Sequence, residues 1–196
     1  MAILTASVRS GRALFAAPVR TLAVVVLLLL PGMRGSAQAT PSREYQVKAV
    51  FLFNFTQFVD WPLTAFSSDS TPLVIGVLGD DPFGSYLDDI VRGEQVNSRK
   101  LTVQRYRRTA DVKVCQVLFV SRSEEKNFGK ALAALKGADV LTVSDADGFA
   151  SQGGMIQLST ENGKIRLKIN VDAAKASSLI ISSKLLRSAK IVASRD

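Results

Sequence analysis

Three short segments of the 196-residue sequence combine residue types that could do chemistry. The segment Gly79-Asp80-Asp81-Pro82-Phe83-Gly84 follows an apolar run, where phosphate-binding loops occur, but its carboxylates would repel a phosphate and its glycine spacing does not fit. The segment Asp145-Ala146-Asp147-Gly148 has the start of a calcium-binding loop, but Phe149 stands where the next ligand is required. We therefore predict that Asp81 caps a helix and that the second segment forms a turn.

The third segment holds Ser182 and Ser183 next to Lys184, and it is the best candidate for a serine nucleophile with a base. Adjacent residues at a helix start point in different directions, so helix capping explains these serines better. The sequence has no histidine and a single cysteine, which exclude a histidine base, a histidine ligand and a multi-cysteine metal site. Cys115 lies beside an apolar run and is interpreted as a core residue. We predict no catalytic residue, no metal ligand and no cofactor.

Two surfaces remain as candidates for binding a partner protein. Between residues 164 and 171, apolar side chains alternate with Lys164, Arg166 and Lys168, so one face of a strand carries a basic row. The helix expected over residues 44–59 is apolar around most of its circumference. Such a helix is either buried on several sides or in contact with a partner, and both alternatives stay open.

A loop aromatic adds to the candidate surface. Phe149 lies between Gly148 and Gly153-Gly154, and we expect this loop to be exposed because its backbone needs water or specific partners. An exposed Phe149 would act as an interface anchor, whereas the alternative is a side chain folded back over the sheet. We assign partner binding to this loop and to the hairpin that follows it, through Phe149, Glu161, Lys164, Arg166 and Lys168.

The elements that must position these residues follow from periodicity and capping signals. Helices are expected over residues 44–59 with Thr40 as N-cap, from Asp81-Pro82 to Gly93, from Ser121 to Gly137, after an Asp172 cap, and after Ser182 or Ser183 through Leu185, Leu186, Ala189 and Val192. Strands are expected over residues 73–78, 101–107, 117–120, 140–143, 155–160 and 164–171, with Asn162-Gly163 as a hairpin turn. This order predicts a single-domain α/β sandwich, in which a mixed β-sheet is flanked by helices and ends in an antiparallel hairpin and a C-terminal helix.

Residues 1–39 have the features of a secretory signal peptide. Arginines precede an apolar run from Leu22 to Leu30, and Ala37 and Ala39 stand where a signal peptidase cleaves. The run is shorter than the roughly 20 helical residues that cross a bilayer. We expect cleavage after Ala39 and export of a mature domain over residues 40–196, with an uncleaved anchor as the alternative.

Composition limits the class of partner. With 47% hydrophobic and 21% charged residues, the chain suits an ordinary globular domain. The formal net charge is +8, but residues 1–39 hold four arginines and no acid, which leaves +4 on residues 40–196. A net charge of this size does not require a nucleic-acid partner, and none is predicted.

A series of segments also forms the pattern of a known family. These segments are residues 44–55, 59–62, 78–84, 115–121, 141–145, 148–150, 153–156, 169–171 and 181–186. In this order, across nearly the whole mature chain, they resemble the YfiR-like family of periplasmic proteins. The resemblance implies a non-enzymatic regulator that tends to self-associate, so a homodimer is expected.

The resemblance also implies partners. The regulator would bind the periplasmic sensor domain of an inner-membrane diguanylate cyclase and hold it inactive, which lowers cyclic di-GMP and biofilm formation. An OmpA-like outer-membrane lipoprotein would relieve this repression by sequestering the regulator. The best understood relative carries a disulfide near the loop at residues 148–154, where this chain has no cysteine, so redox control through that bridge does not carry over.

Two rival functions remain after the resemblance. A periplasmic small-ligand-binding or transport-associated accessory protein would show an apolar pocket with several converging polar groups. A hydrolase that works without histidine is the other rival.

Overall fold

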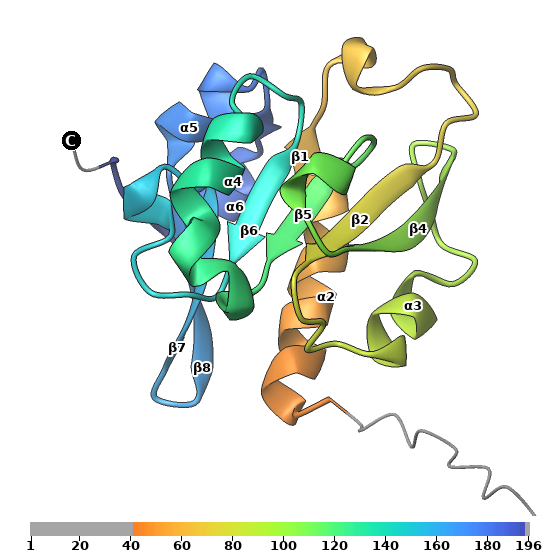
Figure 1. Ribbon diagram of the computed structural model, residues 1–196. Coiled ribbons are helices and arrows are strands. Elements are labelled where there is room, and N and C mark those ends of the chain that lie inside the picture. Colours follow the sequence, from red (N-terminus) through yellow and green to blue (C-terminus); the bar gives the residue numbers. More distant parts are fainter. Residues whose placement is uncertain (1–40, 195–196) are drawn as a thin grey trace, which may run out of the picture. The chain divides into compact units, whose positions relative to one another are not determined.

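The computed structural model describes residues 41–194, which form an α/β sandwich around one mixed sheet (Figure 1). The sheet has eight strands in the order β10-β8-β7-β6-β5-β2-β4-β3. Its strands are β2 (Leu73–Leu78), β3 (Gln95–Val96), β4 (Arg99–Tyr106), β5 (Val117–Val120), β6 (Leu141–Ser144), β7 (Ile156–Glu161), β8 (Lys164–Ile169) and β10 (Ala189–Ile191). The pairs β7–β8 and β3–β4 are antiparallel and the other neighbours are parallel. The predicted fold class is therefore confirmed.

Helices cover both faces of this sheet. They are α2 (Arg43–Phe58), α3 (Ser85–Val91), α4 (Phe128–Ala134), α5 (Val171–Ala176) and α6 (Ser183–Arg187). Alternate residues of a strand point to opposite faces, so Val117 and Phe119 pack in the core cluster with α2 and α3, whereas Leu118 and Val120 pack with α4. The chain also forms a separate antiparallel pair, β1 (Val59–Asp60) with β9 (Ile180–Ile181). Among residues 41–194, none of the helices combines the length and the hydropathy that a membrane span requires.

The long helix α2 is the main element on its face of the sheet. It buries Ala49, Leu52 and Phe55 completely, at the helical spacing expected for a docking face. Val47 and Val50 remain 41% and 40% exposed on the same helix. The helix is therefore buried on the side that faces the sheet, as the first of the two alternatives states. Val47 and Val50 leave apolar surface on another side, where the second alternative, contact with a partner, stays open.

Several predicted helix starts are wrong. Helix α2 begins at Arg43 after Ser42, which makes no side-chain capping bond, and Thr40 lies outside the described residues. Helix α3 begins only after Gly84, because Asp81 caps a preceding turn by accepting a hydrogen bond from the Phe83 amide at 2.8 Å. Asp81 Oδ2 also accepts from Arg105 Nε at 2.8 Å, so this carboxylate holds strand β4 next to the turn.

The C-terminal region also differs from the prediction. Asn170 rather than Asp172 caps α5, because its side-chain oxygen accepts from the Ala173 amide at 3.0 Å. Ser182 caps α6 as predicted, but this helix has only 5 residues. The chain after it does not continue as a helix, because Ala189–Ile191 forms strand β10, parallel to β8.

Candidate functional site

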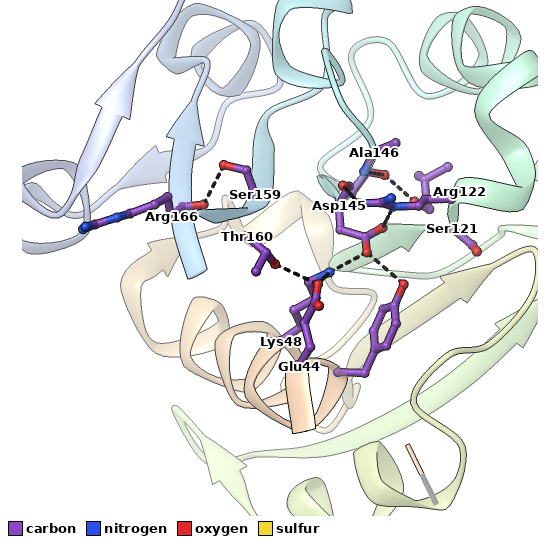
Figure 2. Close-up of polar contacts among 12 residues, drawn as sticks. Glu44, Lys48, Ser121, Arg122, Asp145, Ala146, Ser159, Thr160 and Arg166 are labelled. Atoms are coloured by element: carbon purple, nitrogen blue, oxygen red, sulfur yellow. Dashed lines mark hydrogen bonds and ion pairs between the residues drawn. The ribbon is translucent and has the colours of Figure 1, made fainter. Parts of the chain in front are cut away.

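A buried ion cluster lies at the carboxyl end of strand β6. Asp145 follows β6 directly, and its Oδ2 accepts hydrogen bonds from Lys48 Nζ at 2.6 Å and from the Tyr45 hydroxyl at 2.9 Å (Figure 2). The Lys48 and Asp145 side chains are each only 1% exposed. Since Lys48 and Tyr45 belong to α2, the cluster joins this helix to the end of the central sheet.

A second cation reaches Asp145 from the neighbouring strand. Arg122, just after β5, donates from Nη2 to the Asp145 carbonyl oxygen at 2.8 Å, and its Nε lies 3.4 Å from Asp145 Oδ1. Within residues 41–194, Asp145 Oδ1 is a buried side-chain oxygen that accepts no hydrogen bond. The parallel strands β5 and β6 end side by side, which is why these two residues meet.

The cluster extends to the β7–β8 hairpin through Glu44. Glu44 Oε1 lies 2.5 Å from Lys48 Nζ and accepts from Thr160 Oγ1 of β7 at 2.7 Å. The hydrogen bond from Lys48 lowers the pKa of Glu44, and Thr160 acts in the same direction. Burial and the nearby Asp145 charge raise the pKa of Tyr45 to about 12.

The members of the cluster differ in their exposure to solvent. Two carboxylates, Glu44 and Asp145, face two cations, Lys48 and Arg122, so the charges balance. Water is excluded from Lys48 and Asp145, whereas the Glu44 and Arg122 side chains remain 41% and 55% exposed. The buried Lys48–Asp145 pair cannot meet a substrate without a rearrangement of α2. We conclude that the cluster holds α2 against the ends of β6 and β7.

The structure contradicts the expected exposure of Phe149. Its side chain is fully buried, and its ring packs edge-on against Phe128 of α4 with centroids 5.0 Å apart. Gly154 lies against the same ring, and a β-carbon there would overlap it. The expectation of an exposed anchor is therefore wrong, and the alternative holds, since Phe149 folds back over the sheet as part of the core.

The other assigned residues lie together on the β7–β8 hairpin. Glu161, Lys164 and Arg166 are exposed and Lys168 is half-buried, with Lys168 Nζ 3.9 Å from Glu161 Oε1. Asn162 and Gly163 have φ values of 51° and 71°, as a tight hairpin turn requires. The basic side chains predicted from the sequence therefore lie at the surface of the hairpin. The Phe149 side chain is buried in the core and does not belong to that surface.

The remaining candidate segments have structural roles. Asp145 is used in the ion cluster, and no group of three or more His, Cys, Asp or Glu within residues 41–194 could hold a metal ion. Ser182 Oγ accepts from the Leu185 amide at 3.3 Å, which is the capping role expected of it. The Asp80 amide donates to Ser123 Oγ at 2.9 Å, and this hydrogen bond joins the loop after β2 to the segment after β5.

Sequence reasoning missed the ion cluster, although one signal could have indicated it. Lys48 occupies a position four residues before Leu52 and seven before Phe55, on the stripe that α2 buries. A buried lysine requires an acidic partner. The sequence alone could not identify Asp145, which lies 97 residues away.

Comparisons with known proteins place the chain in a family. The model of the family described as YfiR/HmsC-like matches residues 45–190, from α2 into β10. A search of curated proteins finds no match. Among solved structures, the ABC domain in complex with L-Trp from Streptococcus pneumonia aligns with a TM-score of 0.43 and 12% identity, over 61% of this chain and 55% of that one. The chain thus spans about half the length of that protein. Because the family match covers nearly all of the described fold, the chain belongs to the YfiR/HmsC-like family.

Proposed function

We propose that the chain is a periplasmic binding protein that represses an inner-membrane diguanylate cyclase by binding its periplasmic sensor domain. The observation that carries the proposal is the YfiR/HmsC-like match over residues 45–190. At the level of the family, this membership supports a regulator of cyclic di-GMP signalling rather than an enzyme. Our proposal goes beyond the family in naming the partner, which is the sensor domain of a diguanylate cyclase, and the effect, which is repression.

Repression by binding needs no chemistry from the chain. A protein that binds the inactive conformation of the sensor more tightly shifts the sensor population by its difference in affinity. An affinity ratio of about 100 between two states corresponds to about 2.7 kcal/mol. A surface with a few well-placed contacts can supply a difference of this size.

The β7–β8 hairpin is the surface that we assign to this contact. Its exposed Lys164 and Arg166, with Glu161 and Lys168 beside them, supply the charges of an interface rim. Charges in such a rim raise the association rate, and salt screens their effect. The double variant Lys164→Glu/Arg166→Glu should therefore weaken sensor binding mainly at low salt.

The proposed location rests on residues 1–39, which lie outside the described residues. We propose that they are a signal peptide that is removed after Ala39. N-terminal sequencing of the protein from a periplasmic fraction should begin at Thr40. Recovery of the intact chain in the membrane fraction would contradict this proposal.

Further partners follow from the same family. We propose a homodimer, and an OmpA-like outer-membrane lipoprotein that sequesters the chain and so relieves repression. Light scattering of the purified mature chain tests the first, since a mass near twice that of residues 40–196 is expected. Co-purification of the lipoprotein from membranes tests the second.

A gene deletion tests the proposed regulation. In a strain that carries the cognate cyclase, deletion should raise cellular cyclic di-GMP and surface attachment, and expression of the chain should reverse both. Unchanged cyclic di-GMP and unchanged attachment in the deletion strain would contradict the proposed function.

One observation favours the alternative of a small-ligand-binding accessory protein. A pocket of about 370 Å³ lies between α4 and α5, with Leu132, Leu135 and Met155 as apolar walls. Thr142 and Gln152 contribute polar groups, which is the composition of a small-molecule site. Thermal-shift screening of periplasmic metabolites would favour this alternative if a ligand raises the melting temperature and the change is lost in Leu132→Trp.

A further inference from the structure

A groove runs along the helix α2 on the side that leaves apolar surface exposed. Its larger part has a volume of about 680 Å³ and is lined by Val47 and Phe51 of α2 and by Ile165 of β8. A second hollow of about 210 Å³ continues from Phe51 to Phe58 and Leu185, where α2 meets α6. We call the two hollows, which share Phe51, the α2 groove. In Figure 1 the hairpin and α6 lie along the same side of α2.

The length and the exposure of the groove suit an elongated partner. Helix α2 has 16 residues, which corresponds to a length of about 24 Å. Val47 is 41% exposed although it is an aliphatic residue that lines the larger hollow of the groove. Phe51, Phe58 and Ile165 are half-buried along the groove, and accessible apolar side chains in a hollow are typical of an interaction site.

Positive charges stand at both ends of the α2 groove. Arg43 and Lys164 line one end and Lys184 lines the other. Among residues 41–194, none of the three forms an ion pair. Glu44, an acid in the groove, is already bound to Lys48 and Thr160. The groove therefore complements a partner that is apolar in its middle and acidic at its ends.

We propose that the α2 groove binds an amphipathic α-helix of the cyclase sensor domain, whose apolar stripe is flanked by acidic residues. This inference rests on the function proposed above and adds an apolar binding surface beside the charged rim of the hairpin, with Lys164 common to both. The walls of the groove are side chains of a helix, a sheet face and a second helix, and an extended peptide would need a free strand edge for its backbone. A helix buries side chains at positions i, i+4 and i+7 and makes no such demand.

The experiment measures binding of the purified mature chain to the purified periplasmic domain of the cognate cyclase. Val47→Asp places a charge in the groove and should reduce affinity at least tenfold, whereas folding should be unaffected because the residue is exposed. The matched control is Val114→Asp, since Val114 is also exposed, at 50%, and does not line the groove. An unchanged melting temperature in both variants confirms that they fold.

A charge variant tests the occupant. Lys164→Glu/Lys184→Glu should weaken binding at least tenfold at low salt and less at high salt, and Lys175→Glu on α5 is the control. Hydrogen–deuterium exchange of the sensor domain should then show protection of one helix with acidic flanks.

The outcomes separate this inference from the proposed function. If the wild-type chain binds and the groove variants bind equally well, the groove assignment is wrong and the proposed function stands. Protection of a strand or loop of the sensor domain would overturn the helical occupant. If the wild-type chain does not bind the sensor domain, the proposed function fails, and the groove loses the partner assigned to it.

Discussion

Replacing Asp145 by Asn should destabilise the domain strongly, because it removes one charge from a buried pair and keeps the shape. Lys48 Nζ lies 2.6 Å from Asp145 Oδ2, and both side chains are 1% exposed. Removing one partner of a buried ion pair costs about 3 to 5 kcal/mol in free energy of unfolding. Glu44 still lies beside Lys48 in the variant, so we expect a loss of about 3 kcal/mol, at the lower end of that range.

Thermal and urea unfolding of residues 40–196 measure this loss. For a domain of this size, 1 kcal/mol shifts the melting temperature by about 2 to 4 °C, so a fall of about 6 to 12 °C is expected. The double variant Lys48→Met/Asp145→Asn removes both charges and should recover part of the stability, because no uncompensated charge stays buried. A loss below about 1 kcal/mol for Asp145→Asn would refute the argument, because an exposed ion pair is worth no more than that.

Three further changes test the core and the ion cluster. Phe149→Ala should lower the free energy of unfolding in urea by about 3 to 5 kcal/mol, as expected for a large side chain lost from the core. A variant of near wild-type stability would contradict the burial of this side chain. Gly154→Ala should also destabilise, because the new β-carbon overlaps the Phe149 ring, and an unchanged melting temperature would contradict this packing. The folded pKa of Glu44 is lowered by Lys48, so its stabilising contribution is present above the unfolded pKa and is lost as the pH falls through the folded value. Melting temperatures measured from pH 6 to acid should therefore fall less steeply in Glu44→Gln, and identical slopes would contradict the coupling.

Elements defined by local signals could be predicted from the sequence. The strands Leu73–Leu78 and Val117–Val120 agree with the prediction at both ends, because a short apolar run bounded by turn residues determines each of them. The Asn162-Gly163 turn was equally readable, since both residues readily adopt the positive φ that the hairpin needs. These elements account for the correct fold class.

Features that depend on contacts distant in the chain could not be predicted. Strand β10 has only 3 residues, too few for periodicity to distinguish a strand from the end of a helix, and it exists because Ala189–Ile191 pairs with β8. Phe149 is buried because Gly154, which has no side chain, leaves room for its ring next to Phe128. The partner of Lys48 depends on where β6 ends, and only the assembled sheet determines that position.

The most direct test of the proposed repression is the activity of the full-length cyclase reconstituted in lipid nanodiscs, in which the periplasmic domain is accessible. The rate of cyclic di-GMP formation from GTP is measured as the purified mature chain is added. We predict a saturable fall in rate, with a midpoint at the dissociation constant of the sensor complex and a shift to higher concentration for Val47→Asp. A rate that stays constant at concentrations that saturate the sensor domain would contradict repression.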